Sequence, residues 1–200
     1  MNAWHDIEIS RITPKDFLCY IEIPKGSKCK YELDKESGFL ILDRILYTAV
    51  RYPMSYGFIP KTLGDDGDPL DVLVLCDEAI AAGCLVECYP IGAIMMTDGD
   101  KQDEKIIAIP FGDPSYNSIK CIQDLPEHRF IEMMHFFEVY KDIQTSAKVV
   151  VDGIVDAEKS YKIIADCLDN YALHFNREPS ESSPFEIKYR AARGEKISPL

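Results

Sequence analysis

The sequence predicts an α+β protein that is mainly β, in which two principal helices pack against a small closed barrel. Residues 1–110 consist of short apolar runs separated by glycine, proline and aspartate, whereas apolar residues recur at helical spacing after residue 124. Hydrophobic residues make up 46% and charged residues 28% of the chain, which are ordinary globular values. Many short strands with turns between them favour a barrel over alternating β–α units.

The strands of the predicted barrel follow one another along the first half of the chain. Residues 30–33 alternate polar and apolar side chains, the period of a half-buried strand, and Lys35–Gly38 supply a hairpin turn. The strand candidates in order are Phe17–Ile23, the hairpin 30–46, Asp71–Cys76, Cys84–Met96 and Lys105–Pro110.

The two predicted helices lie in the second half of the chain. We expect Asp124 to cap the first helix, with Pro126 in its first turn and Glu127 three residues after the cap. A further strand is predicted over 148–154 and a second helix from about Asp156. Both apolar stripes are interpreted as core rather than as a cofactor site. The stripes are Phe130, Met133, Met134 and Phe137 in the first helix and Tyr161, Ile164, Ala165, Leu168, Tyr171, Ala172 and Phe175 in the second.

Length and composition narrow the possible roles of the chain. With 200 residues we expect a single domain over 1–175 and a C-terminal extension of unknown role over 176–200. A formal net charge of -12 opposes nucleic-acid binding, and no apolar run is long enough to span a membrane, so neither partner is expected. Seven cysteines without a Cys-x-x-Cys pair, and no visible secretory signal, indicate a reduced, cytoplasmic protein.

A cluster of carboxylates stands out at residues 64–71, just before an apolar strand. Four aspartates crowd this turn, and like charges so close together repel by about 1 kcal/mol per pair in water. Oxygen ligands without nearby His or Cys favour Mg²⁺, Mn²⁺ or Ca²⁺ over zinc. The spacing does not match an EF-hand loop. The four residues are Asp65, Asp66, Asp68 and Asp71.

A second acidic loop and several basic residues complete the chemically informative positions. The loop at 98–105 contains Asp98 and Asp103, and basic or phenolic side chains occur at Lys30, Arg44, Lys105 and Tyr140–Lys141. Divalent ions bridge carboxylates to phosphate oxygens, and Lys and Arg bind the remaining oxygens. These residues therefore suggest a pocket that binds metal and phosphate together. The sequence has no phosphate-binding loop, dinucleotide motif or nucleophile elbow.

The motif Asp66-Gly-Asp68-Pro-Leu-Asp71-Val resembles the metal-site signature of the soluble, magnesium-dependent family I inorganic pyrophosphatases of bacterial type. The resemblance extends from about residue 20 to about residue 142. Other matching stretches are Ile21–Pro24, Lys30–Glu32, Asp34–Gly38, Asp43-Arg44, Tyr52–Gly57, Met96–Asp98, Asp103–Lys105 and His135–Asp142.

The resemblance implies a five-stranded barrel of the oligonucleotide-binding type and hydrolysis of pyrophosphate to two orthophosphates. It assigns several Mg²⁺ ions, or Mn²⁺ and other divalent substitutes, to Asp66, Asp71, Asp103, Asp98 and Glu22. Asp68 would activate the attacking water, with Tyr56 modulating it. Phosphate oxygens would be bound by Lys30, Arg44, Lys105, Tyr140 and Lys141, and Glu32 and Tyr52 match pocket residues of less defined role.

The resemblance also favours a homo-oligomer, with a hexamer expected because bacterial members are usually hexameric. Ser55 stands where many bacterial relatives have Asn, next to Tyr56. Two alternatives remain from other classes: a metal-dependent hydrolase of nucleotides or polyphosphates, and a non-catalytic barrel that binds single-stranded nucleic acid. The acidic charge opposes the second alternative, because such modules need a basic groove.

Overall fold

A computed structural model describes residues 2–99, 101–144 and 149–175 of the chain. The predicted C-terminal extension, 176–200, lies outside the described residues. The strands are β1 (Phe17–Ile23), β2 (Cys29–Leu33), β3 (Leu40–Ile45), β4 (Ser55–Phe58), β5 (Asp71–Val74), β6 (Leu85–Asp98), β7 (Lys101–Gln102), β8 (Lys105–Pro110) and β9 (Val149–Asp156). The helices are α1 (Glu127–Val139) and α2 (Ala157–His174), with short 3₁₀ turns at Ile9–Arg11 and Ile122–Asp124.

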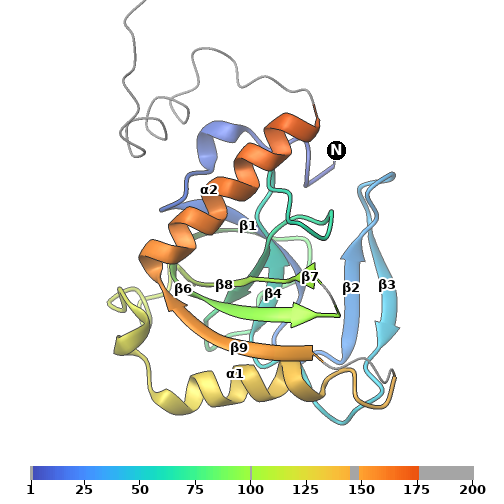
Figure 1. The fold of residues 1–200 in the computed structure, drawn as a ribbon, viewed down its shortest axis with the longest axis vertical. Coiled ribbons are helices and arrows are strands. Elements are labelled where there is room, and N and C mark those ends of the chain that lie inside the picture. Colours follow the sequence, from blue (N-terminus) through green and yellow to red (C-terminus); the bar gives the residue numbers. More distant parts are fainter. Residues whose placement is uncertain (1, 100, 145–148, 176–200) are drawn as a thin grey trace, which may run out of the picture.

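Five strands form a closed ring of hydrogen-bonded neighbours in the order β1-β4-β5-β8-β6, and β6 returns to β1 (Figure 1). All pairs in the ring are antiparallel except β5 and β8, which run parallel. β7 and β9 extend the sheet from β6. The predicted mainly-β architecture with a five-stranded closed sheet and two helices is thereby confirmed. No helix in the described ranges has the length and apolar character to cross a bilayer.

β4 is the ring strand that the sequence did not predict. It is only four residues long and follows Pro53, and Gly57 lies in its middle, so its local propensity for a strand is weak. Gly57 is required here because a Cβ at this position would lie 1.9 Å from the carbonyl oxygen of Tyr20 on β1. The strand therefore depends on close backbone packing against β1, which short-range sequence patterns do not encode.

The hairpin β2–β3 forms a separate two-stranded sheet beside the ring (Figure 1). Its turn closes where predicted, with hydrogen bonds from Gly38 N to Asp34 O and from Asp34 N to Phe39 O, each 2.8 Å long. Gly38 adopts a φ of +74°, which glycine reaches at no steric cost. This arrangement leaves one edge of the hairpin facing the ring, where a cavity forms.

The second helix, α2, begins at the predicted position near Asp156. Asp156 caps α2, because its Oδ1 accepts a hydrogen bond from Lys159 N at 3.0 Å. The prediction that Asp124 caps α1 is wrong: its carboxylate accepts bonds from Lys120 N and Cys121 N, at the start of the 3₁₀ turn Ile122–Asp124. Pro126 takes the cap position instead, with no side-chain bond.

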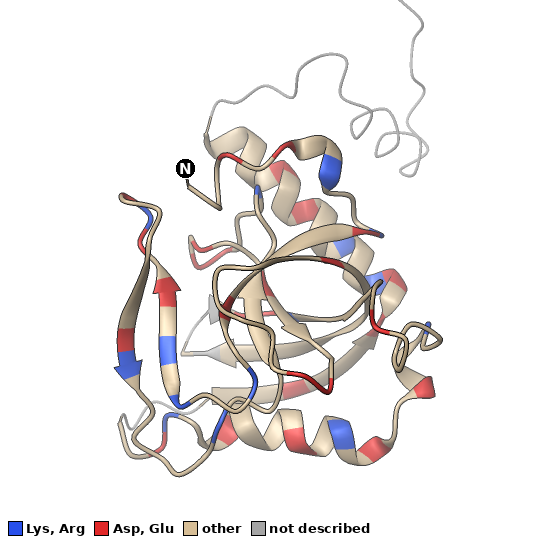
Figure 2. Ribbon diagram, turned by 180° about the vertical axis from the view of Figure 1, so that it is seen from behind, with Lys and Arg blue, Asp and Glu red and all other residues tan. Residues whose placement is uncertain are grey.

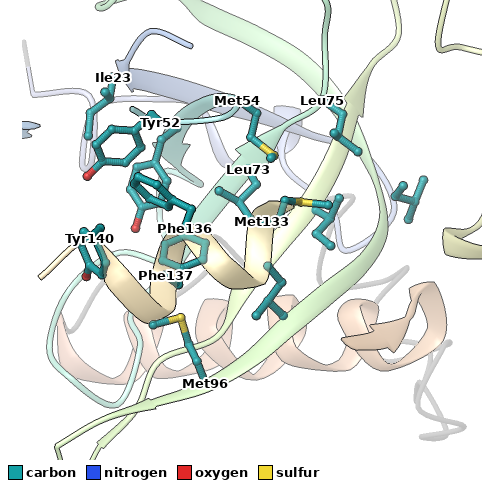
Figure 3. Packing of buried hydrophobic residues seen from close by; sticks show 14 of the residues in the cluster. Ile23, Tyr52, Met54, Leu73, Leu75, Met96, Met133, Phe136, Phe137 and Tyr140 are labelled. Carbon is teal, nitrogen blue, oxygen red and sulfur yellow. The ribbon is translucent and has the colours of Figure 1, made fainter. Parts of the chain in front are cut away.

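The two helices cover different parts of the apolar core. α2 contributes Ile163, Ile164 and Leu168 to one buried cluster, together with β1, β5 and β8. α1 contributes Met133, Phe136 and Phe137 to a second cluster with Leu73 and Met96 from the sheet (Figure 3). The second cluster ends at three tyrosines that line the cavity described below.

Candidate active site

A cavity of about 240 Å³ opens between the hairpin β2–β3, the ring and the end of α1. It brings together nearly all of the residues that the sequence analysis singled out. Of these, Glu22, Lys30, Glu32, Tyr52, Tyr56, Asp66, Asp68, Asp71, Asp103, Lys105, Tyr140 and Lys141 line the cavity. Arg44 is not among the described residues of the lining, and the side chain of Asp98 lies outside the described part of the structure.

The acidic turn, residues 64–71, forms one wall of this cavity. A hydrogen bond of 2.7 Å from Gly64 N to Asp68 O closes the turn, and Gly67 adopts a φ of +90°. Asp66 Oδ1 accepts a bond of 3.0 Å from the backbone N–H of Asp68. Asp71 is the first residue of β5, so the sheet fixes its backbone. The turn therefore presents three carboxylates toward one space, as the sequence predicted.

Lys105 lies between two of the acidic residues at the floor of the cavity. The parallel pairing of β5 with β8 places it opposite Asp71, and its Nζ lies 2.5 Å from Asp71 Oδ2 and also contacts Asp103 Oδ1. Lys105 is buried, and burial alone would lower its pKa, but Asp71 and Asp103 raise it above the ordinary value. The ammonium group therefore remains charged at neutral pH and offsets the repulsion between the two carboxylates.

Burial also affects the carboxyl groups of the cavity. Glu22, near the end of β1, accepts a bond of 2.7 Å from Leu33 N. Burial, with the nearby charge of Asp71, raises the pKa of Glu22 to about 8. Burial likewise raises the pKa of Asp71, against the opposing effect of Lys105. A cation that entered the cavity would favour the ionised form of both carboxyl groups and so lower these pKa values.

Tyr52, Tyr56 and Tyr140 line the cavity and also belong to the second apolar cluster. Figure 3 shows Tyr52 and Tyr140 beside Phe136. The ring centroids of Tyr52 and Tyr56 are 5.6 Å apart, and Phe136 packs between Tyr52 and Tyr140 at 4.8 and 5.3 Å. Burial raises the pKa of both Tyr52 and Tyr56, so their hydroxyls stay protonated. The nearby carboxylate of Asp71 also raises the pKa of Tyr56.

The hairpin carries both acidic and basic residues (Figure 2), and its Lys30 and Glu32 line the opposite wall of the cavity. Lys30 contacts Glu32 and lies 3.3 Å from Asp43 Oδ2, and the register places Lys30 opposite Arg44. The guanidinium of Arg44 lies 2.5 Å from the same Asp43 oxygen, while its Nε is buried without a hydrogen-bond partner. Asp43 therefore holds both basic residues at this wall, although only Lys30 reaches the lining.

Several lining residues were not predicted to belong to the site, among them Trp4 and Lys35. Trp4 comes from the N-terminal segment, far from any motif. Lys35 was interpreted only as part of the hairpin turn. The signal that could have marked Lys35 is its place inside a stretch that matches the family pattern.

Ser55, which stands next to Tyr56 where many bacterial relatives have Asn, is buried. Its hydroxyl oxygen accepts hydrogen bonds from Lys25 N and Ile80 N at 3.3 and 3.2 Å.

The donor chemistry of the cavity fits a divalent cation such as Mg²⁺. Its acidic groups are carboxylates, the ligand type that Mg²⁺ prefers, and Asp71 and Asp103 already share a cationic partner in Lys105. No three metal-ligating side chains among the described residues converge tightly enough to enclose an ion by themselves. Water and substrate oxygens usually complete the coordination of Mg²⁺ in proteins.

Comparison with known proteins agrees with this chemistry. Residues 19–172 match the family model described as inorganic pyrophosphatase. "Soluble inorganic pyrophosphatase 2" of Chlamydomonas reinhardtii is 46% identical over 174 residues, which cover 87% of this chain and 90% of that protein. The soluble inorganic pyrophosphatase of Oryza sativa subsp. japonica is 44% identical over 173 residues, which cover 86% of this chain and 80% of that protein.

Solved structures give the same result. The inorganic pyrophosphatase of Helicobacter pylori is 43% identical with a TM-score of 0.79, covering 83% of this chain and 98% of that chain. The enzyme from Thermus thermophilus is 36% identical with a TM-score of 0.81, and the match covers 86% of this chain and 99% of that chain. The family resemblance seen in the sequence is therefore confirmed. We conclude that the chain belongs to the inorganic pyrophosphatase family and is an inorganic diphosphatase, an enzyme that hydrolyses pyrophosphate.

Proposed function

We propose that the cavity hydrolyses pyrophosphate in a Mg²⁺-dependent reaction. The observation that carries this proposal is the meeting of carboxylates from the acidic turn with Lys30, Lys105 and Lys141 around one cavity. Carboxylates are suited to divalent ions, and lysines to the phosphate oxygens that those ions leave uncovered. A cavity with both kinds of group suits a multiply charged anion that arrives together with cations.

Asp66, Asp71 and Asp103 are proposed to hold Mg²⁺, with Asp98 and Glu22 contributing when substrate binds. Bound Mg²⁺ supplies charge screening and a lowered pKa for a water molecule. The buried setting of Glu22 and Asp71 is compatible with this assignment, because a bound cation would stabilise the ionised form of each carboxyl group against the desolvation that raises its pKa. Mn²⁺ and related ions have similar ligand preferences and are expected to substitute.

Asp68 is proposed as the residue that accepts a proton from the attacking water. It lies on the acidic turn and lines the cavity, and its side chain is about half exposed, so water reaches it. Tyr56 remains protonated and lines the same cavity as Asp68, which supports its proposed role in modulating the polar environment beside Asp68. A positioned general base typically contributes a factor of about 10² to 10⁴ to the rate.

The remaining polar residues are proposed to bind phosphate oxygens. Lys30, Lys105, Lys141 and Tyr140 line the cavity, and Glu32 and Tyr52 shape it. Arg44 stays in the proposal because it shares Asp43 with Lys30 on the same wall. In phosphoryl transfer the protein contributes mainly positioning and charge stabilisation, so these groups would orient the substrate and stabilise the leaving phosphate.

An assay of phosphate release distinguishes pyrophosphate hydrolysis from the alternatives. We expect release from pyrophosphate only when Mg²⁺ is present, and much slower release from ATP and tripolyphosphate under the same conditions. Faster release from ATP or tripolyphosphate would favour the nucleotide or polyphosphate hydrolase. Failure to cleave pyrophosphate with Mg²⁺ would contradict the proposal.

We further propose a homo-oligomer, with a hexamer favoured, that works in the cytoplasm. Exposed apolar side chains on α1 and β9, Ile131 and Val150, support a contact between subunits. The seven cysteines are free, which supports a reducing compartment. We also propose 1–175 as the catalytic domain. Light scattering after size exclusion tests the subunit number, since a hexamer gives six times the chain mass of 22.7 kDa.

A further inference from the structure

Lys35 connects two walls of the cavity. It lies in the turn of the hairpin β2–β3, and its ammonium group forms an ion pair with the carboxylate of Asp68 on the acidic turn. The same nitrogen lies 3.4 Å from the carbonyl oxygen of Gly67. The two partners are 33 positions apart in the sequence, so this contact exists only because the hairpin folds against the acidic turn.

The N-terminal segment fixes Lys35 from the other side. The Nζ of Lys35 lies 5.4 Å from the ring centroid of Trp4, a distance at which the ammonium is attracted to the indole face. The carbonyl oxygen of Lys35 accepts a bond of 2.8 Å from Nδ2 of Asn2. Both the backbone and the charged end of Lys35 are therefore held by residues 2–4.

Trp4 is itself anchored to the base of the acidic turn. Trp4 is 3% exposed, and its Nε1 donates a bond of 2.8 Å to the carbonyl oxygen of Thr62. The hydroxyl of Thr62 accepts a bond of 2.8 Å from Leu70 N, which ties together the two ends of the turn. Trp4, Lys35 and Asp68 thus form a connected set around a single loop.

We propose that Lys35 is a positioning residue for the reaction: it holds the carboxylate of Asp68 toward the cavity, and Trp4 holds Lys35 in place. This inference rests on the proposed role of Asp68 as the residue that acts on water. A carboxylate on an exposed turn samples several rotamers, and an ion pair with a fixed ammonium favours one of them. The ammonium also offsets the repulsion between Asp68 and its neighbour Asp66.

Kinetics of pyrophosphate hydrolysis at saturating Mg²⁺ test this role. In Lys35→Met, which keeps the aliphatic stem, we expect kcat to fall about three- to tenfold with KM changed less than twofold, given the modest strength of a half-exposed ion pair. Lys35→Arg should recover most of the loss, because guanidinium also pairs with carboxylate. The matched control is Lys162→Met, which removes an exposed Lys–Asp pair on α2 and should behave as the wild type.

A double-mutant cycle with Asp68→Asn separates this inference from the proposed function. If Lys35 acts through Asp68, Lys35→Met should have no further effect in the Asp68→Asn background. Equal effects in both backgrounds would overturn the positioning role while leaving Asp68 as the base. An Asp68→Asn variant with wild-type activity would instead refute the base assignment in the proposed function.

The fluorescence of Trp4 gives a readout independent of activity, because it is the only tryptophan in the chain. Removing the ammonium beside the indole should shift its emission in Lys35→Met and not in Lys162→Met. Unchanged emission in Lys35→Met would overturn the placement of Lys35 by Trp4. A raised KM with unchanged kcat in Lys35→Met would show that Lys35 binds phosphate directly. A kcat of Lys35→Arg no higher than that of Lys35→Met would show a purely structural role. Either result overturns the inference.

Discussion

The ammonium nitrogen of Lys105 lies 2.5 Å from Oδ2 of Asp71, across the parallel pair β5–β8, and the lysine is only 3% exposed. The same nitrogen contacts Asp103. A buried cation with two carboxylate partners offsets their repulsion at the floor of the cavity. This relationship allows the protein to fold with its acidic residues facing one another before any divalent ion binds.

Lys105→Met is expected to destabilise the metal-free protein by about 2–4 kcal/mol, because it leaves two partly buried carboxylates without their cation. Urea unfolding in the presence of a chelator measures this change. Added Mg²⁺ should reduce the difference from the wild type, since a divalent ion replaces the missing charge. A difference of less than about 0.5 kcal/mol without metal would show that the pair is energetically unimportant.

Asp66→Asn should raise the Mg²⁺ concentration needed for half-maximal activity, with a smaller effect on kcat at saturating metal. The reason is that an amide oxygen is a weaker ligand for Mg²⁺ than a carboxylate. The thermal shift produced by added Mg²⁺ should move to higher concentration in parallel, which gives a readout without substrate. Asp65→Asn is the matched control, because Asp65 does not line the cavity. Identical Mg²⁺ titrations for Asp66→Asn and wild type would argue against the ligand assignment.

Gly57→Ala is expected to lower stability by at least about 3 kcal/mol, because the new Cβ would lie 1.9 Å from the backbone oxygen of Tyr20 and force β1 and β4 apart. Thermal or urea unfolding measures the loss. Gly112→Ala is the control, since no heavy atom lies within 4 Å of its Cβ position. If both variants unfolded like the wild type, the close approach of β4 to β1 would be disproved.

The thiol of Cys167 predicts a change of stability with pH. Burial and nearby acidic residues raise its pKa to about 12 in the folded chain, whereas an unfolded thiol ionises near 8.5. As pH rises, the thiol therefore loses its proton in the unfolded state first, which stabilises the unfolded state. The free energy of unfolding should fall above about pH 8.5 for this reason, by about 1 kcal/mol between pH 8.5 and 9.5. Urea unfolding at these two pH values should show a smaller decline for Cys167→Ala than for the wild type.

Cys84→Ala is the control for that experiment, because Cys84 is exposed in the folded chain. Its decline of stability with pH should equal that of the wild type. An equal decline in the Cys167→Ala variant would show that the Cys167 thiol does not contribute to the pH dependence.

The parts of the fold with strong local signals could be predicted from the sequence. β1 and β8 have the predicted bounds, and the Asp156 cap marks the start of α2. β4 was missed because its formation depends on the contact of Gly57 with β1. Asp124 was misassigned because the pattern of a helix cap also occurs where a carboxylate bonds to the preceding turn.

The candidate site could be predicted as far as motifs extend. The acidic turn was recognised from its four aspartates and the strand that follows them, and the cavity lining includes three of the four, Asp66, Asp68 and Asp71. Trp4 and Lys35 were not predicted as part of the site. They reach it only because the N-terminal segment and the hairpin meet at the acidic turn. Arg44 faces Asp43 rather than the lining, a difference set by pairing within the hairpin.

The most direct test of the proposed chemistry is the kcat of Asp68→Asn for pyrophosphate at saturating Mg²⁺. We predict a fall of about 10²- to 10⁴-fold, because the variant loses the group that accepts the proton from water. The thermal stabilisation by Mg²⁺ should be close to that of the wild type, since Asp66, Asp71 and Asp103 remain. A kcat within a few fold of the wild-type value would contradict the role of Asp68 and the proposed organisation of the site around it.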